Sequence, residues 1–79
     1  MSNKEKYNQI FKHVFTVEEN ALNEEFSILN VDKWDSVAHM SLISELEEAF
    51  DIMFDTDDII NFTSYMCGMD MLKKYGIEF

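Results

Sequence analysis

Ser36 places a hydroxyl at the start of a predicted helix, and this position has its own chemistry. It follows Asp35 and precedes Val37, where an apolar helical pattern begins. A group at a helix N-terminus lies beside backbone N–H groups that have no partner within the helix and beside the positive end of the helix dipole, so negative charge is favoured there. The Asp-Ser pair has little specificity by itself, because any serine near a helix start that follows an aspartate looks the same.

His39 lies one helical turn after Ser36, within the apolar stripe of the same predicted helix. Two interpretations are open. The imidazole lines the mouth of an apolar pocket, or it is hydrogen-bonded to the loop before the helix, which is the commoner role of a partly buried histidine and the one we favour. We do not expect a nucleophile and base pair of Ser36 and His39, because the two side chains point in different directions and no oxyanion hole can be proposed.

Metal chemistry is not predicted. Counted from Asp55, a calcium loop would place Ile60 where glycine is required and Met66 where a bidentate glutamate is required. Cys67 is the single cysteine, so the chain forms neither an internal disulfide nor a thiolate zinc site. We interpret it as a small core residue of a helix and expect a protein of the reducing cytoplasm.

The chain is small, and its composition combines a large excess of acidic residues with a high hydrophobic content. Its 79 residues include 16 acidic and 6 basic side chains, for a formal charge of −10 at pH 7, and 47% of the residues are hydrophobic. This apolar content is too high for an acidic disordered tail and predicts one domain over residues 1–79. So short a chain buries only about 60% of the surface of its unfolded form, which leaves little room for a deep active site, and we expect no enzymatic activity.

The charges also limit the partners. All six basic residues are lysines, so the chain lacks the arginines and the positive surface that recognise nucleic acid. An acidic surface instead attracts basic patches on other proteins. Because every apolar stretch is broken by charge, we expect no signal peptide and no membrane insertion.

Helical periodicity dominates the first half of the chain. The first helix is predicted to begin at Ser2, which forms an S-x-x-E capping box with Glu5, and to bury Tyr7, Ile10, Phe11, Val14 and Phe15. Residues 16–35 are predicted to form a long ordered connection whose core anchors are Phe26, Leu29, Val31 and Trp34.

Two more helices and a short turn complete the predicted fold. The second helix covers about residues 36–50 and buries Leu42, Ile43, Leu46 and Phe50. A brief turn over residues 57–61 buries Ile59, Ile60 and Phe62. The last helix is predicted to begin with Thr63 as N-cap, to end near Tyr75 before Gly76, and to bury Met66, Met69 and Leu72. The expected fold class is therefore all-α, with three main helices and one short helix.

The motif after Trp34 adds specificity. Asp35-Ser36-Val37 stands at a helix start, and Leu46-Glu47-Glu48-Ala49-Phe50-Asp51 stands at the end of the same helix. In both motifs, in their spacing, and in length and acidity, the chain resembles the acyl carrier protein family over nearly its whole length. The resemblance implies a small up-down bundle that carries acyl groups as thioesters. The thiol would belong to a 4′-phosphopantetheine arm on Ser36, donated from coenzyme A by a phosphopantetheinyl transferase.

The resemblance also implies partner enzymes that load and accept acyl groups and that present basic patches to this helix. Carriers of general fatty acid synthesis usually have acidic residues early in the helix, where this chain has Ala38 and Ser41. We therefore expect a narrower set of partners, in a specialised lipid, polyketide or surface-polysaccharide pathway. The candidate contact residues are Asp35 and Val37 from the motif, and Met40, Glu45 and Glu48 from the helical wheel.

Two alternatives stay open. An aminoacyl or peptidyl carrier uses the same arm, although the acidity favours acyl cargo. A protein of a different class, an unmodified acidic helical interaction module, would present the same charged face without a prosthetic group. A carrier that presents one arm to several enzymes is expected to be a monomer, and whether His39 lines its acyl pocket stays open.

Overall fold

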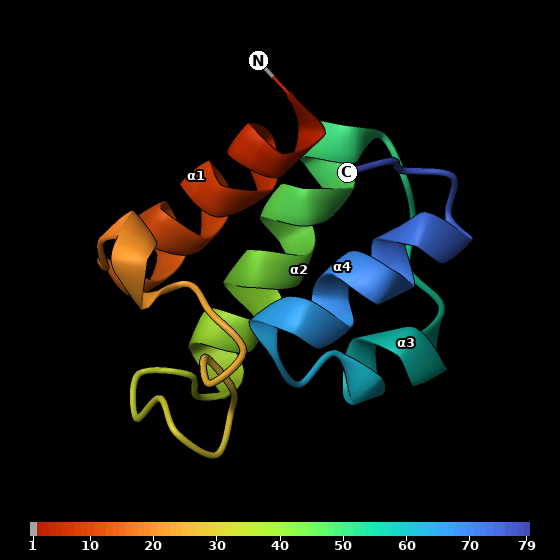
Figure 1. The fold of residues 1–79 in the computed structure, drawn as a ribbon. Helices are drawn as coiled ribbons and strands as arrows, with labels where there is room; N and C mark the ends of the chain where they lie inside the picture. The colour runs from red at the N-terminus through yellow and green to blue at the C-terminus, as the bar shows by residue number, and fades with distance from the viewer. Residues whose placement is uncertain (1) are drawn as a thin grey trace.

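The computed structural model describes residues 2–79, which form an all-α fold (Figure 1). The elements in chain order are α1 (Asn3–Phe15), the 3-10 turn η1 (Glu19–Ala21), α2 (Ser36–Phe50), α3 (Thr56–Asn61) and α4 (Tyr65–Lys74). Over these residues there is no strand, only an isolated bridge between Ser27 and Ser64. The predicted class, with three main helices and a short one, is confirmed. Within residues 2–79, no helix has both the length and the apolar character needed to cross a membrane.

The capping box at the start of α1 forms as predicted. The backbone N of Glu5 donates to Ser2 Oγ at 3.1 Å, and Ser2 Oγ donates to Glu5 Oε1 at 3.4 Å. The helix ends at Thr16, which has a left-handed backbone with φ 54°. Lys33 Nζ donates to the free carbonyl of Phe15 at 3.3 Å, so a distant lysine completes this end of α1.

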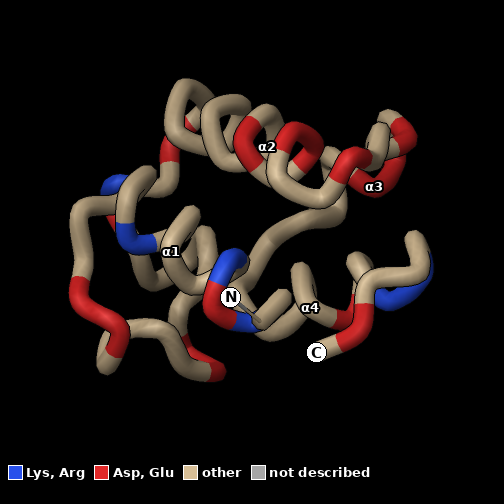
Figure 2. The backbone as a smooth tube through the Cα atoms, turned by 90° about the horizontal axis from the view of Figure 1, so that it is seen from above, with Lys and Arg blue, Asp and Glu red and all other residues tan. Residues whose placement is uncertain are grey.

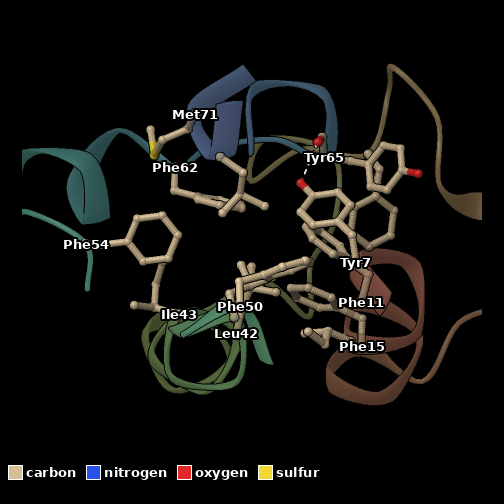
Figure 3. Packing of buried hydrophobic residues seen from close by; sticks show 14 of the residues in the cluster. Tyr7, Phe11, Phe15, Leu42, Ile43, Phe50, Phe54, Phe62, Tyr65 and Met71 are labelled. Carbon is tan, nitrogen blue, oxygen red and sulfur yellow. Dashed lines mark hydrogen bonds between the residues drawn. The ribbon is translucent and has the colours of Figure 1, made fainter. Parts of the chain in front are cut away.

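Aromatic rings from several elements fill the core (Figure 3). α1 and α2 lie side by side and run in opposite directions, and the buried face of α1 contains Tyr7, Phe11 and Phe15. The radius of gyration is 11.4 Å. A compact chain of this length has a radius of gyration of about 11.6 Å, so a single core accounts for the whole fold.

The connection between α1 and α2 packs onto the core through fewer residues than predicted. Phe26 and Trp34 are buried and Val31 is half-buried, but Leu29 is 91% exposed, so its predicted burial is wrong. The backbone N atoms of Asn30 and Val31 both donate to the carbonyl of Ser27, and this tight turn directs Leu29 into solvent.

α2 has the predicted bounds, and its four predicted core residues are buried. α3 begins at Thr56, slightly earlier than predicted. Phe62 is fully buried and Ile59 is half-buried, whereas Ile60 is 67% exposed, so its predicted burial is wrong. Neighbouring residues on a helix point about 100° apart, and in so short a helix only one of the two isoleucines can face the core.

α4 begins one residue later than predicted, because Ser64 and not Thr63 is its N-cap. Ser64 Oγ accepts a hydrogen bond from the backbone N of Cys67 at 3.0 Å. Cys67 is half-buried against the core, and Gly76 has the predicted left-handed backbone, with φ 88°.

The buried face of α4 is also displaced from the predicted one. It comprises Tyr65, Gly68, Met71 and Leu72, while Met66 is 46% exposed and Met69 is half-buried. A Cβ atom on Gly68 would lie 2.2 Å from Tyr7 Oη and 2.2 Å from Phe62 Cζ. The absence of a side chain at Gly68 therefore allows these two rings to reach the helix backbone, and this sets the rotation of α4.

Polar contacts join the remaining surfaces. Tyr7 Oη donates to the carbonyl of Tyr65 at 2.6 Å, and the Tyr65 hydroxyl donates to Asn8 Oδ1, so both buried hydroxyls have acceptors. Between α3 and α4, Lys74 Nζ lies 3.0 Å from Asp58 Oδ1 and the hydroxyl of Tyr75 donates to the other oxygen of the same carboxylate.

Candidate functional site

Ser36 is the first residue of α2 and is exposed. The N-cap is Asp35, whose Oδ1 accepts from the backbone N of Ala38 at 2.8 Å and whose carbonyl accepts from the backbone N of His39 at 2.8 Å. Because Asp35 caps the helix, the hydroxyl of Ser36 is not needed for capping. Within residues 2–79 it makes no hydrogen bond, so it is available to an approaching enzyme.

The surroundings of Ser36 fit a phosphate ester at this hydroxyl. The first turn of α2 contains no acidic side chain, and a helix N-terminus favours negative charge. Asp35 already complements the helix dipole, and the nearby Lys33 is directed to the carbonyl of Phe15. Because Ser36 is exposed, a phosphate attached to its hydroxyl would extend into solvent.

An open depression borders Ser36. Its volume is about 420 Å³, and we call it the Ser36 depression. Three segments form it, namely the connection before α2, the first turns of α2, and α3. Its lining residues are Ile28, Trp34, Asp35, Ser36, His39, Met40, Ile59 and Ile60. Most of these side chains are apolar, so a group attached to Ser36 has an apolar surface beside it.

His39 lines the depression, and both of its ring nitrogens are hydrogen-bonded. Trp34 Nε1 donates to His39 Nδ1 at 2.9 Å. An indole nitrogen can only donate, so Nδ1 is the unprotonated nitrogen, and Nε2–H donates to the carbonyl of Ile59 at 2.7 Å. The predicted bond to the preceding loop is confirmed, and the same imidazole also lines the depression. Since both ring nitrogens are engaged, His39 is not placed to act as a base for Ser36.

The five predicted contact residues fall into two groups. Asp35, Val37 and Met40 surround Ser36; the side chains of Val37 and Met40 are 77% and 55% exposed. Glu48 is exposed but lies 12 residues after Ser36, which is about 18 Å along a helix axis. Glu45 is half-buried, and its Oε1 lies 3.2 Å from His13 Nδ1 of α1.

Several residues at the site were not predicted. Ile28 and the two isoleucines of α3 reach the depression from segments far from Ser36 in sequence, and no local pattern marks them.

Glu47, in the second half of α2, has a structural role away from the depression. Its Oε2 accepts a hydrogen bond from the backbone N of Phe54 at 2.9 Å and fixes the loop after α2. The side chain of Trp34, immediately before the motif, was a recognisable sign that this loop packs onto the core.

Acidic side chains follow the first turns of α2 rather than lying within them. Figure 2 shows acidic residues over the second half of α2 and over α3. They are Glu45, Glu47, Glu48, Asp51, Asp55, Asp57 and Asp58. The first turn of α2 at the serine thus carries no acidic side chain, while the second half of the same helix carries several.

Neither the protein-family models nor the curated proteins with which the chain was compared contain a match to it. The interpretation of this site rests on the motif residues and on their geometry.

Proposed function

We propose that this chain is a carrier protein of the acyl carrier type, with a 4′-phosphopantetheine arm on Ser36. The observation that carries this proposal is the exposed hydroxyl of Ser36, which has no hydrogen bond to any of residues 2–79 and begins α2 beside an apolar depression within an Asp-Ser-Val motif. The proposal includes the up-down arrangement of the helices as the family's bundle, a cytoplasmic location and a monomeric state.

The residues around Ser36 have separate tasks in this function. Asp35 caps α2 and so holds the first turn in a fixed geometry, which leaves the serine hydroxyl accessible to a phosphopantetheinyl transferase. The arm, when attached, supplies a thiol that holds acyl groups as thioesters. The protein itself would perform no bond chemistry on the cargo.

Partner enzymes would meet an apolar centre with an acidic border. Val37 and Met40 offer exposed apolar contact next to the serine, and Glu48 adds negative charge farther along α2. Enzymes that load and accept acyl groups are expected to present a small apolar surface with basic residues at one side. The displaced acidity supports partners in a specialised lipid, polyketide or surface-polysaccharide pathway.

The test is incubation of the purified chain with coenzyme A, magnesium and a broad-specificity phosphopantetheinyl transferase, followed by proteolysis and tandem mass spectrometry. We expect one phosphopantetheine on the peptide that contains Ser36. An added group on another serine would contradict the assignment.

The exposed apolar side chains Val37 and Met40 also favour a second candidate, an interaction module that needs no arm. It predicts no added mass under conditions that modify a control carrier. An aminoacyl or peptidyl carrier would be modified in the same way and would differ only in its cargo.

A further inference from the structure

The chain's own aromatic side chains occupy the space beneath the Ser36 depression. Phe62 is fully buried, and its ring centroid lies 6.4 Å from that of Trp34, 6.5 Å from that of His39 and 6.0 Å from that of Phe54. Figure 3 shows Phe54 and Phe62 in the space between α2 and α4. An apolar chain entering there would have to displace these rings.

The opposite side of this space is equally full. The ring of Phe62 comes so close to α4 that a single methyl group on Gly68 would lie 2.2 Å from its Cζ atom. The space between Gly68 and the ring of Phe62 thus has no room for an added carbon atom, and interiors packed in this way resist enlargement.

Hydrogen bonds join three of the residues that line the depression. The bonds from Trp34 to His39 and from His39 to the carbonyl of Ile59 join the connection, α2 and α3 across it. A group that passed from the depression into the core would break both bonds and leave buried polar groups without partners, which is unfavourable. The depression is therefore a shallow external surface.

We propose that the cargo of this carrier is a short or polar acyl unit that stays outside the core. This inference rests on the proposed function. The thiol lies at the far end of the arm from Ser36, so the walls formed by Ile28, Met40 and Ile60 can cover only the part of the arm near the serine. A long alkyl chain would remain in water, at a cost that grows with its apolar area, whereas a short or polar unit loses little there.

The test uses the intact chain. A broad-specificity phosphopantetheinyl transferase attaches the acyl-phosphopantetheine of acetyl-, hexanoyl- or dodecanoyl-coenzyme A to Ser36, and intact mass establishes the loading. Two quantities are measured, the melting temperature and the rate at which hydroxylamine releases the acyl group as a hydroxamate. A chain buried in the fold would stabilise the native state and protect its thioester. We expect release rates that agree within about twofold across the series and a constant melting temperature, since no acyl chain is buried.

Two variants identify the cause. Phe62→Leu makes space beneath the depression, and Phe50→Leu makes similar space at the far end of α2. In Phe62→Leu the apolar area that a dodecanoyl chain could bury in the new space outweighs the loss of the two hydrogen bonds of His39, so we expect slower release of the dodecanoyl group in this variant only. Equal release of all three groups in that variant would contradict the role of Phe62. If Phe62→Leu does not fold, the series on the unaltered chain still decides the proposal.

Slower release and a higher melting temperature of the dodecanoyl form of the unaltered chain would overturn the cargo inference and leave the carrier function intact. Failure of Ser36 to gain any group would overturn both. The mass measurement thus separates the two failures.

Discussion

His39 joins three segments of the site through its two hydrogen bonds, so its replacement tests the geometry around Ser36. His39→Phe removes the acceptor for Trp34 Nε1, which belongs to a side chain that is only 3% exposed, and the donor to the carbonyl of Ile59. An unpaired buried polar group costs about 1–3 kcal/mol, so we expect the free energy of unfolding to fall by at least about 1 kcal/mol in urea titrations. The matched control is His13→Phe, at an exposed histidine. Equal effects of the two substitutions would contradict the proposed bonds.

Gly68 provides a second test at the residue scale. Alanine is the better helix former by about 1 kcal/mol, yet we expect Gly68→Ala to destabilise the protein by about 1–3 kcal/mol because its Cβ overlaps two buried rings. Asp70→Ala, on the exposed side of the same helix, should change stability little. Thermal unfolding of both variants measures the difference, and a stabilised Gly68→Ala would show that α4 is rotated differently.

At the scale of elements, the joint between α3 and α4 gives the fold a dependence on pH. Hydrogen bonds from the Tyr75 hydroxyl and from Lys74 hold the pKa of Asp58 below its ordinary value. A lowered pKa in the folded state means that the charged carboxylate stabilises the fold above about pH 4, and that this contribution is lost as the pH falls through the folded-state pKa.

Asp58→Asn should therefore lower the melting temperature at pH 7, and its effect should shrink as the pH falls through the lowered folded-state pKa of the parent carboxylate. The control Asp57→Asn, at an exposed neighbour on α3, should show no such trend. Melting curves from pH 2 to pH 8 test this. A constant difference between Asp58→Asn and the parent at all pH values would contradict the role of the carboxylate.

The elements were predictable where local chemistry determines them. The capping box of Ser2 and Glu5, the left-handed Gly76 and the apolar stripe of α2 all act within a few residues, and each matches its prediction. Rotation about a helix axis depends on distant partners instead. The exposure of Met66 follows from the approach of Tyr7 to Gly68, which no pattern within α4 indicates.

For the whole molecule, charge is the property most easily altered. The net charge is −10, and Figure 2 shows acidic residues over the second half of α2, over α3 and along the connection before α2. We expect the melting temperature to rise as sodium chloride increases from about 0.01 M to 0.15 M, because the screening length falls from about 30 Å to about 8 Å. Glu48→Gln should raise the melting temperature at low salt and lose this advantage at high salt. Melting curves that do not respond to salt would contradict the role of repulsion.

The all-α class and the position of Ser36 at the start of α2 could be predicted because both follow from helical periodicity and helix-start chemistry. The filled interior could not be predicted, because it depends on which rings meet across the fold. Phe62 and Trp34 are apolar in the sequence, but only their packing around His39 shows that the depression is shallow.

The measurement that decides the proposed function is the intact mass of four purified chains after incubation with coenzyme A, magnesium and a broad-specificity phosphopantetheinyl transferase. The chains are the parent, Ser36→Ala, and the controls Ser41→Ala and Ser44→Ala at exposed serines of the same helix. The carrier function predicts one added phosphopantetheine in the parent and in both controls, and none in Ser36→Ala. An unmodified parent, beside a control carrier that is fully modified, would contradict it.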